Sequence, residues 1–183
     1  MMRLKSKPIR LLLVDDHQVV LVGLRTVLHN NQGITVVGEA GSKAAAVRAA
    51  KRLKPDIVLM DVRPPDGSGA EACRAILASH PTTRVIFLTS YADDEFVLAA
   101  VRVGAQGYDL KNIDSRLLIR SVRAVSNGRS ILNPALTQPA LSRIKAGTAQ
   151  AGPVRKQSLT PEEERVLTLV VERLTNKEIA AMM

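Results

Sequence analysis

The sequence predicts an α/β fold built on a doubly wound, five-stranded parallel sheet of the flavodoxin-like kind. Short apolar runs alternate five times with segments whose apolar residues have helical spacing. The runs are continuously apolar, which is typical of parallel strands covered by helices on both faces. These units occupy roughly 120 residues, about half the length that a closed eightfold barrel needs. An open sheet is therefore expected.

The predicted elements follow one another along the first two thirds of the chain. Strands are expected at residues 9–14, 34–37, 56–60, 85–88 and 106–110. Helices are expected at residues 20–28, 43–54, 69–79, 93–104 and 114–127. Ser42 is a suitable N-cap for the second helix, and Gly128 is a suitable C-terminal stop for the last one.

The pattern changes after this domain. Residues 131–158 contain Pro, Gly and basic side chains, so we expect a linker with room for a helical turn near 136–145. Residues 159–183 contain two capping boxes, which begin at Thr160 and Thr175 and predict two helices. Two helices are too few to bury a core, so the chain is expected to stop inside a small all-α domain.

Composition limits the classes of protein. Of 183 residues, 46% are apolar and 23% charged, which is typical of a globular protein and excludes collagen-like or fully disordered chains. A single Cys excludes a disulfide framework and a Cys-based zinc site. No apolar run approaches the ~20 residues of a membrane span, so a cytoplasmic protein without a membrane partner is expected. The net charge of +9 fits a polyanion partner such as DNA, or simply a soluble surface.

Polar residues follow the predicted strands at the edge where open α/β sheets bind ligands. Asp15 and Asp16 end the first strand, Asp61 the third and Thr89 the fourth, and Lys111 follows the fifth. Carboxylates gathered at one edge need a cation, for which Mg²⁺ is the most suitable. A hydroxyl and an ammonium suit a phosphoryl group, and a carboxylate can attack phosphorus. The pattern therefore predicts phosphoryl chemistry.

Each of these residues also has an ordinary structural explanation. Asp16 could be a helix N-cap, and Thr89 could be a strand-end residue. Lys111 could be a solvated surface lysine, and Asp61 could be a turn-forming aspartate. Their occurrence together at strand ends in one chain favours a functional site.

Four motifs, LLLVDDH, DIVLMDVRPPDGSG, VIFLTSY and GYDLK, resemble the receiver domain of two-component response regulators over residues 1–130. The tail LTPEEERVLTLVVERLTNKEIA resembles the start of the LuxR-type helix-turn-helix domain of the NarL/FixJ subfamily. The resemblance implies a receiver domain at 1–130, a linker at 131–158 and an incomplete helix-turn-helix domain at 159–183. The recognition helix would lie beyond Met183, so no complete DNA-binding site is expected in this chain.

By matching position, the resemblance implies that Asp61 accepts a phosphoryl group from a histidine kinase. Asp15, Asp16, Asp61 and the backbone carbonyl of Arg63 would hold Mg²⁺. The protein would be a signalling switch rather than an enzyme, with at most self-catalysed phosphoryl transfer and dephosphorylation. Its further partners would be DNA, for the intact protein, and a second copy in an active homodimer.

The resemblance also implies how the switch would operate. Thr89 and Lys111 would bind phosphoryl oxygens, and Tyr108 would be the aromatic switch residue. Two positions depart from the family pattern: Pro64 replaces Met or Leu, and Asp109 replaces an apolar strand residue. Asp109 could compete for Lys111 or point outward at a sheet edge. A Mg²⁺-dependent phosphohydrolase and a phosphorylation-independent binding module are the alternative functions.

Overall fold

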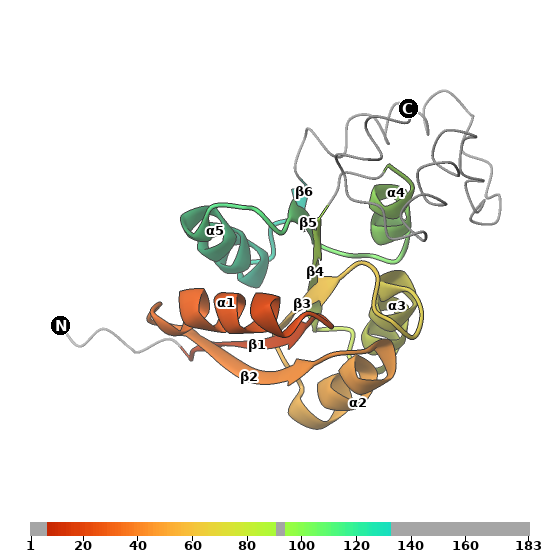
Figure 1. The fold of residues 1–183 in the computed structure, drawn as a ribbon, viewed down its shortest axis with the longest axis horizontal. Helices are drawn as coiled ribbons and strands as arrows, with labels where there is room; N and C mark the ends of the chain where they lie inside the picture. Colours follow the sequence, from red (N-terminus) through yellow and green to blue (C-terminus); the bar gives the residue numbers. More distant parts are fainter. Residues whose placement is uncertain (1–6, 91–93, 133–183) are drawn as a thin grey trace, which may run out of the picture. The chain divides into compact units, whose positions relative to one another are not determined.

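The computed structural model describes residues 7–90 and 94–132. Within them lies a parallel sheet of six strands in the order β2-β1-β3-β4-β5-β6, and the first five strands confirm the predicted doubly wound sheet (Figure 1). The strands are β1 (Ile9–Val14), β2 (Ile34–Ala40), β3 (Ile57–Asp61), β4 (Arg84–Thr89), β5 (Gly107–Leu110) and β6 (Ile131–Leu132). The predicted helix-turn-helix and all but two residues of the predicted linker lie outside the described residues.

Helices cover both faces of the sheet (Figure 1). The helices are α1 (Gln18–His29), α2 (Lys43–Leu53), α3 (Gly69–Ser79), α4 (Asp94–Arg102) and α5 (Ser115–Ser126). One face is covered by α1 and α5, and the other by α2, α3 and α4 (Figure 1). This arrangement follows from the right-handed crossovers that connect parallel strands.

The core consists of one apolar layer on each face of the sheet. Successive strand residues point to opposite faces, so Leu11 and Leu13 pack toward α1 and α5, whereas Leu12 and Val14 pack toward α2 and α3. All five residues of β3 are buried, because this central strand has a helix layer on either side. The continuously apolar runs in the sequence therefore reflect burial on two sides.

The helix boundaries agree with the predicted signals. The Ser42 hydroxyl accepts a hydrogen bond from the Ala45 N–H at 3.2 Å, as the predicted N-cap of α2 should. Asp114 caps α5 in the same way, through the Arg116 N–H at 2.8 Å. Gly128 follows α5 with a φ of 83°, a conformation that glycine adopts without strain.

The sixth strand was not predicted. After Gly128 the chain turns back, and the Ile131 N–H donates to the Gln106 carbonyl at 2.7 Å. Ile131 also packs against the apolar layer of α1 and α5. The strand has only two residues, too short for a recognisable alternation in the sequence.

The chain divides into two units, residues 1–148 and 149–183, and every described residue belongs to the first. Among the described residues, none of the helices is both long and apolar enough to cross a membrane.

We predict that Gly69→Ala destabilises the protein by about 1–3 kcal/mol, because overpacking forces backbone to move. A Cβ at Gly69 would lie 2.5 Å from the Asp61 carbonyl oxygen and 3.0 Å from both the Phe87 ring and the Val62 carbonyl oxygen. Gly23→Ala is the control: its Cβ would meet nothing within 4 Å, and alanine stabilises a helix interior by roughly 0.5–1 kcal/mol. Urea unfolding measures both variants, and midpoints that shift in the same direction would contradict this account.

Candidate phosphoryl-acceptor site

The carboxyl ends of four parallel strands bring the predicted site residues to one edge of the sheet. Val14, the last residue of β1, pairs with Met60 of β3. Asp15 and Asp61 each follow one member of this pair, so they lie next to each other in the register. Thr89 ends β4, the strand paired with β3, and Lys111 follows β5, the strand paired with β4. The backbone N–H of Lys111 donates a hydrogen bond to the Thr89 carbonyl at 2.7 Å, which continues the hydrogen bonding between β4 and β5 into the site. The strand register therefore gathers these residues as predicted.

The Lys111 ammonium bridges two carboxylates from different strands. Its Nζ lies 2.6 Å from Asp15 Oδ2 and 2.7 Å from Asp61 Oδ1. The side chain of Lys111 is only 13% exposed, that of Asp15 3% and that of Asp61 9%. Lys111 is therefore not a solvated surface lysine, and Asp61 is more than a turn former.

The pKa of Lys111 is raised above its ordinary value. Burial acts in the opposite direction and by itself would lower this pKa, but the hydrogen bonds to Asp15 and Asp61 and their negative charges outweigh it. A lysine whose pKa is raised on folding stabilises the fold below its ordinary pKa, and that stabilisation is lost only as pH rises through the raised value. The ammonium is consequently charged, and its contribution complete, at neutral pH.

His17 joins the acidic cluster, although it was not among the predicted site residues. Its Nδ1 lies 2.9 Å from Asp16 Oδ1 and 3.1 Å from Asp15 Oδ1, and its backbone N–H donates to Asp15 Oδ1 at 2.9 Å. His17, rather than Asp16, is the N-cap residue of α1. The alternative explanation of Asp16 as a helix N-cap is therefore wrong. In the sequence, the position of His17 directly after Asp15 and Asp16, in the motif DDH, was the one feature that could have indicated its part in the cluster.

The loop after β3 fixes the orientation of the Asp61 carboxylate. The Arg63 N–H donates to Asp61 Oδ2 at 3.0 Å, while Lys111 contacts the other oxygen. The Gly69 N–H donates to the Val62 carbonyl at 3.0 Å and closes the loop at the start of α3. Both oxygens of Asp61 thus have a donor from the protein.

The same loop is anchored to a second helix. The Asp66 carboxylate accepts hydrogen bonds from the backbone N–H groups of Lys43 and Ala44, at the N-terminus of α2. The pKa of Asp66 is lowered, above all by the Ala44 N–H. A carboxylate is favourable at a helix N-terminus because the first N–H groups there have no partner within the helix. This contact and the buried Pro64, whose ring fixes φ, restrict the backbone of the loop beside Asp61.

The predicted switch residues are buried in different surroundings. Thr89 is 8% exposed at the end of β4 and follows Leu88, the residue that pairs with Asp61. Tyr108 lies in the apolar layer under α2, α3 and α4, with its ring centroid 6.4 Å from that of Phe87. Asp109 is also buried, so it does not point outward at a sheet edge, and its carboxylate accepts the Leu110 N–H at 3.0 Å.

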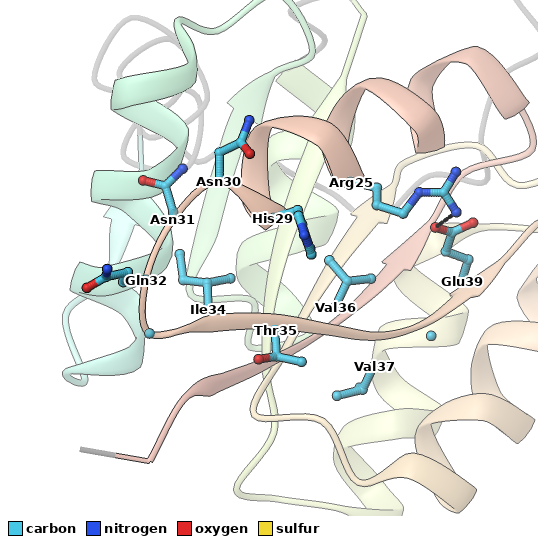
Figure 2. A pocket seen from close by; sticks show the side chains of 12 residues that line it. Arg25, His29, Asn30, Asn31, Gln32, Ile34, Thr35, Val36, Val37 and Glu39 are labelled. Atoms are coloured by element: carbon cyan, nitrogen blue, oxygen red, sulfur yellow. Dashed lines mark hydrogen bonds and ion pairs between the residues drawn. The ribbon is translucent and has the colours of Figure 1, made fainter. Parts of the chain in front are cut away.

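A separate cavity of about 820 Å³ lies along the outer edge of β2 and the end of α1 (Figure 2). Arg25 and Glu39 form an ion pair of 3.1 Å across one end of it (Figure 2). His29, Asn30 and Asn31 line the other end (Figure 2). None of the predicted site residues lines this cavity, so it has no part in the predicted chemistry.

The acidic cluster has the donor set that a hard divalent cation prefers. Asp15 and Asp61 are buried carboxylates, and Asp16 adds a third at the solvent side, 35% exposed. One ammonium cannot neutralise three carboxylates, and the carboxylates of Asp15 and Asp16, with ligand atoms within 4.8 Å of each other, repel. Oxygen ligands with surplus negative charge suit Mg²⁺. The residues present therefore fit the predicted metal.

Comparison with known proteins shows the family. The response regulator receiver domain matches residues 11–123. Over 175 residues the chain is 40% identical to the DNA-binding transcriptional activator DevR/DosR of Mycobacterium tuberculosis, a match that covers 96% of this chain and 80% of that protein. The chain belongs to the two-component response regulators. Among these, it is also 37% identical over 171 residues to the transcriptional regulatory protein LiaR of Bacillus subtilis, covering 93% of this chain and 80% of that protein.

A solved structure supports the same assignment of this response regulator. The crystal structure of a LuxR-family two-component response regulator from Aurantimonas is similar with a TM-score of 0.70 and 32% identity. The match covers 76% of this chain and 99% of that one. The predicted function, a response regulator of the kind that controls transcription, is confirmed at this level.

We predict that Lys111→Met destabilises this response regulator by about 3 kcal/mol, because it leaves two buried carboxylates without their shared cation. Lys43→Met is the matched control. It removes an ammonium that lies 2.8 Å from Glu71, but this pair is much more exposed, and exposed pairs contribute little. Denaturant unfolding at neutral pH, without added metal, compares the two variants. Equal midpoints would contradict the bridging role of Lys111.

Proposed function

We propose that Asp61 is the residue that a histidine kinase phosphorylates, in the presence of Mg²⁺, and that this modification controls a DNA-binding output. The observation that carries the proposal is the placement of the Asp61 carboxylate. It lies at the end of the central strand, oriented by the Arg63 N–H on one oxygen and by Lys111 on the other. A carboxylate held in this way is ready to act as a nucleophile without further rearrangement.

In the proposed reaction, an oxygen of Asp61 attacks the phosphorus of a phosphohistidine. A new O–P bond forms, the P–N bond breaks, and the released imidazole nitrogen takes up a proton. Lys111 lies close enough to pair with the added negative charge, and the Thr89 hydroxyl would donate to a second phosphoryl oxygen. The metal, held by Asp15, Asp16, Asp61 and the Arg63 carbonyl, would supply further charge neutralisation.

The proposed output follows from the redistribution of charge. Phosphorylation replaces the carboxylate charge of −1 on Asp61 by a phosphoryl charge of up to about −2. This adds up to about one negative charge beside groups that are already paired, so we expect Thr89 and Lys111 to move toward the new group. Tyr108 lies on β5, the strand paired with β4, and would follow the movement of Thr89. The repacked surface would favour a homodimer and would control the DNA-binding output domain, of which 159–183 is expected to be the first part. With a kinase and DNA as partners, the protein would act in the cytoplasm.

We predict that a small phosphodonor with Mg²⁺ adds one phosphoryl group to the wild-type chain and none to Asp61→Asn. Asp56→Asn is the control, since Asp56 lies at the opposite end of β3, where its carboxylate accepts the Arg10 N–H at 2.8 Å. Intact-mass measurement should show full labelling of this control and loss of labelling when the metal is chelated. Persistent labelling of Asp61→Asn would refute the assignment of the acceptor.

A further inference from the structure

Three side chains with metal-ligand atoms follow β1 as consecutive residues. Asp15, Asp16 and His17 each offer one ligand atom, and these atoms all lie within 4.8 Å of one another. In the part of the chain that the structure describes, no other three His, Cys, Asp or Glu side chains are grouped in this way. Asp15 and Asp16 also belong to the proposed Mg²⁺ site. His17 adds a nitrogen to a set of oxygens, and Mg²⁺ prefers oxygen ligands.

The two oxygens of the Asp15 carboxylate face different partners. Oδ2 lies 2.6 Å from the Lys111 Nζ, whereas Oδ1 lies 3.1 Å from the His17 Nδ1 and accepts the His17 backbone N–H at 2.9 Å. The carboxylate is buried, so these contacts determine its orientation. Oδ1 is therefore the oxygen that a cation beside His17 can bind without displacing Lys111.

The separations between the imidazole nitrogen and the carboxylates suit a single ion. The His17 Nδ1 lies 3.1 Å from Asp15 Oδ1 and 2.9 Å from Asp16 Oδ1. Two ligand atoms at right angles, each about 2.1 Å from one ion, are about 3.0 Å apart. The side chains of Asp16 and His17 are 35% and 67% exposed, so an ion can enter from solvent and keep water molecules as its remaining ligands.

The chemistry of the ligands decides which cation benefits from His17. Zn²⁺ binds imidazole nitrogen as well as carboxylate oxygen, whereas Mg²⁺ gains nothing from the ring. In the metal-free protein, a proton on Nδ1 accounts for its short contacts with both carboxylates. A bound ion replaces this proton, and the neutral ring keeps its other proton on Nε2.

We propose that His17 gives the site a preference for zinc: Zn²⁺ binds Asp15 Oδ1, Asp16 and the His17 Nδ1, and it competes there with Mg²⁺. This inference rests on the proposed function in one respect, because Asp15 and Asp16 are the carboxylates that would hold Mg²⁺. The two ions exclude each other, since they need the same two carboxylates and repel at such a short distance. Zinc would thus oppose the Mg²⁺-dependent modification of Asp61.

Calorimetric titration of the full chain with ZnCl₂ and, separately, with MgCl₂ tests the proposal. His17→Gln should weaken Zn²⁺ binding by about tenfold or more, because one of three protein ligands is lost, and change Mg²⁺ binding by less than about threefold. His29→Gln is the matched control: it removes an exposed histidine that belongs to no group of metal ligands among the described residues. It should leave both affinities unchanged. In the wild type, added Mg²⁺ should raise the apparent Kd for Zn²⁺.

Three results of the titrations would overturn the inference. The first is equal Zn²⁺ binding by the wild type and His17→Gln. The second is an equal loss of Mg²⁺ binding in His17→Gln, which would mean that His17 only positions the carboxylates. The third is Zn²⁺ binding that Mg²⁺ does not weaken.

Nitrogen NMR of the full chain labelled with ¹⁵N-histidine locates the bound ion. The chain has three histidines, and the two His→Gln variants assign their ring signals. Zn²⁺ should shift the Nδ1 signal of His17 strongly, whereas Mg²⁺, which the ring does not bind, should shift it much less. Zinc-induced shifts confined to His29 or His80 would contradict the assigned ligand.

Intact mass after treatment with a small phosphodonor and Mg²⁺, without zinc, separates this inference from the proposed function. Full labelling of a wild type whose His17 does not respond to Zn²⁺ would overturn the zinc site alone. Absence of labelling in a wild type whose His17 binds Zn²⁺ would overturn the proposed acceptor and leave the zinc site standing.

Discussion

The structure depends on one ammonium shared by two carboxylates from different strands. Lys111, Asp15 and Asp61 come from segments far apart in the sequence, and their side chains are almost completely removed from solvent. Burying charges is favourable only when they are paired with good geometry. The strand order and register supply that geometry, because they bring the ends of β1 and β3 together and place the segment after β5 within reach. The geometry of the site therefore depends on the strand register, because a register shift in any of these strands would leave a buried charge without its partner.

The loop between β3 and α3 is fixed by contacts with the elements around the carboxylates. Asp66 joins the β3–α3 loop to the N-terminus of α2, and Gly69 allows the start of α3 to approach the Asp61 backbone. These contacts hold the acceptor still, which is what nucleophilic attack requires. Toward α4, the same loop makes a cation–π contact, in which the Arg63 guanidinium carbon lies 4.7 Å from the centroid of the Phe96 ring.

The sequence was most informative where a local pattern of residues determines the structure. Continuously apolar runs located the buried strands, and the polar residues at their ends located Asp15, Asp61, Thr89 and Lys111. It was less informative where the partner is distant in the chain. The contact of Asp66 with α2 and that of Arg63 with Phe96 depend on tertiary placement, which no local pattern records. The sequence did not indicate β6, because a strand of two residues is too short to show the alternation of apolar and polar side chains. It did not indicate His17 either, because this residue belongs to the cluster only through its contact with the neighbouring Asp16.

The central claim is that Lys111 and the proposed Mg²⁺ share the same carboxylates, and metal affinity tests it most directly. Calorimetric titration with Mg²⁺ would compare the wild type with Lys111→Met. Removing a positive charge a few ångströms from the metal should strengthen binding by about tenfold or more, even with strong dielectric screening. We expect this gain in Mg²⁺ affinity although the same substitution destabilises the metal-free protein. Equal or weaker Mg²⁺ binding by Lys111→Met would show that the ammonium and the metal do not act on one set of carboxylates.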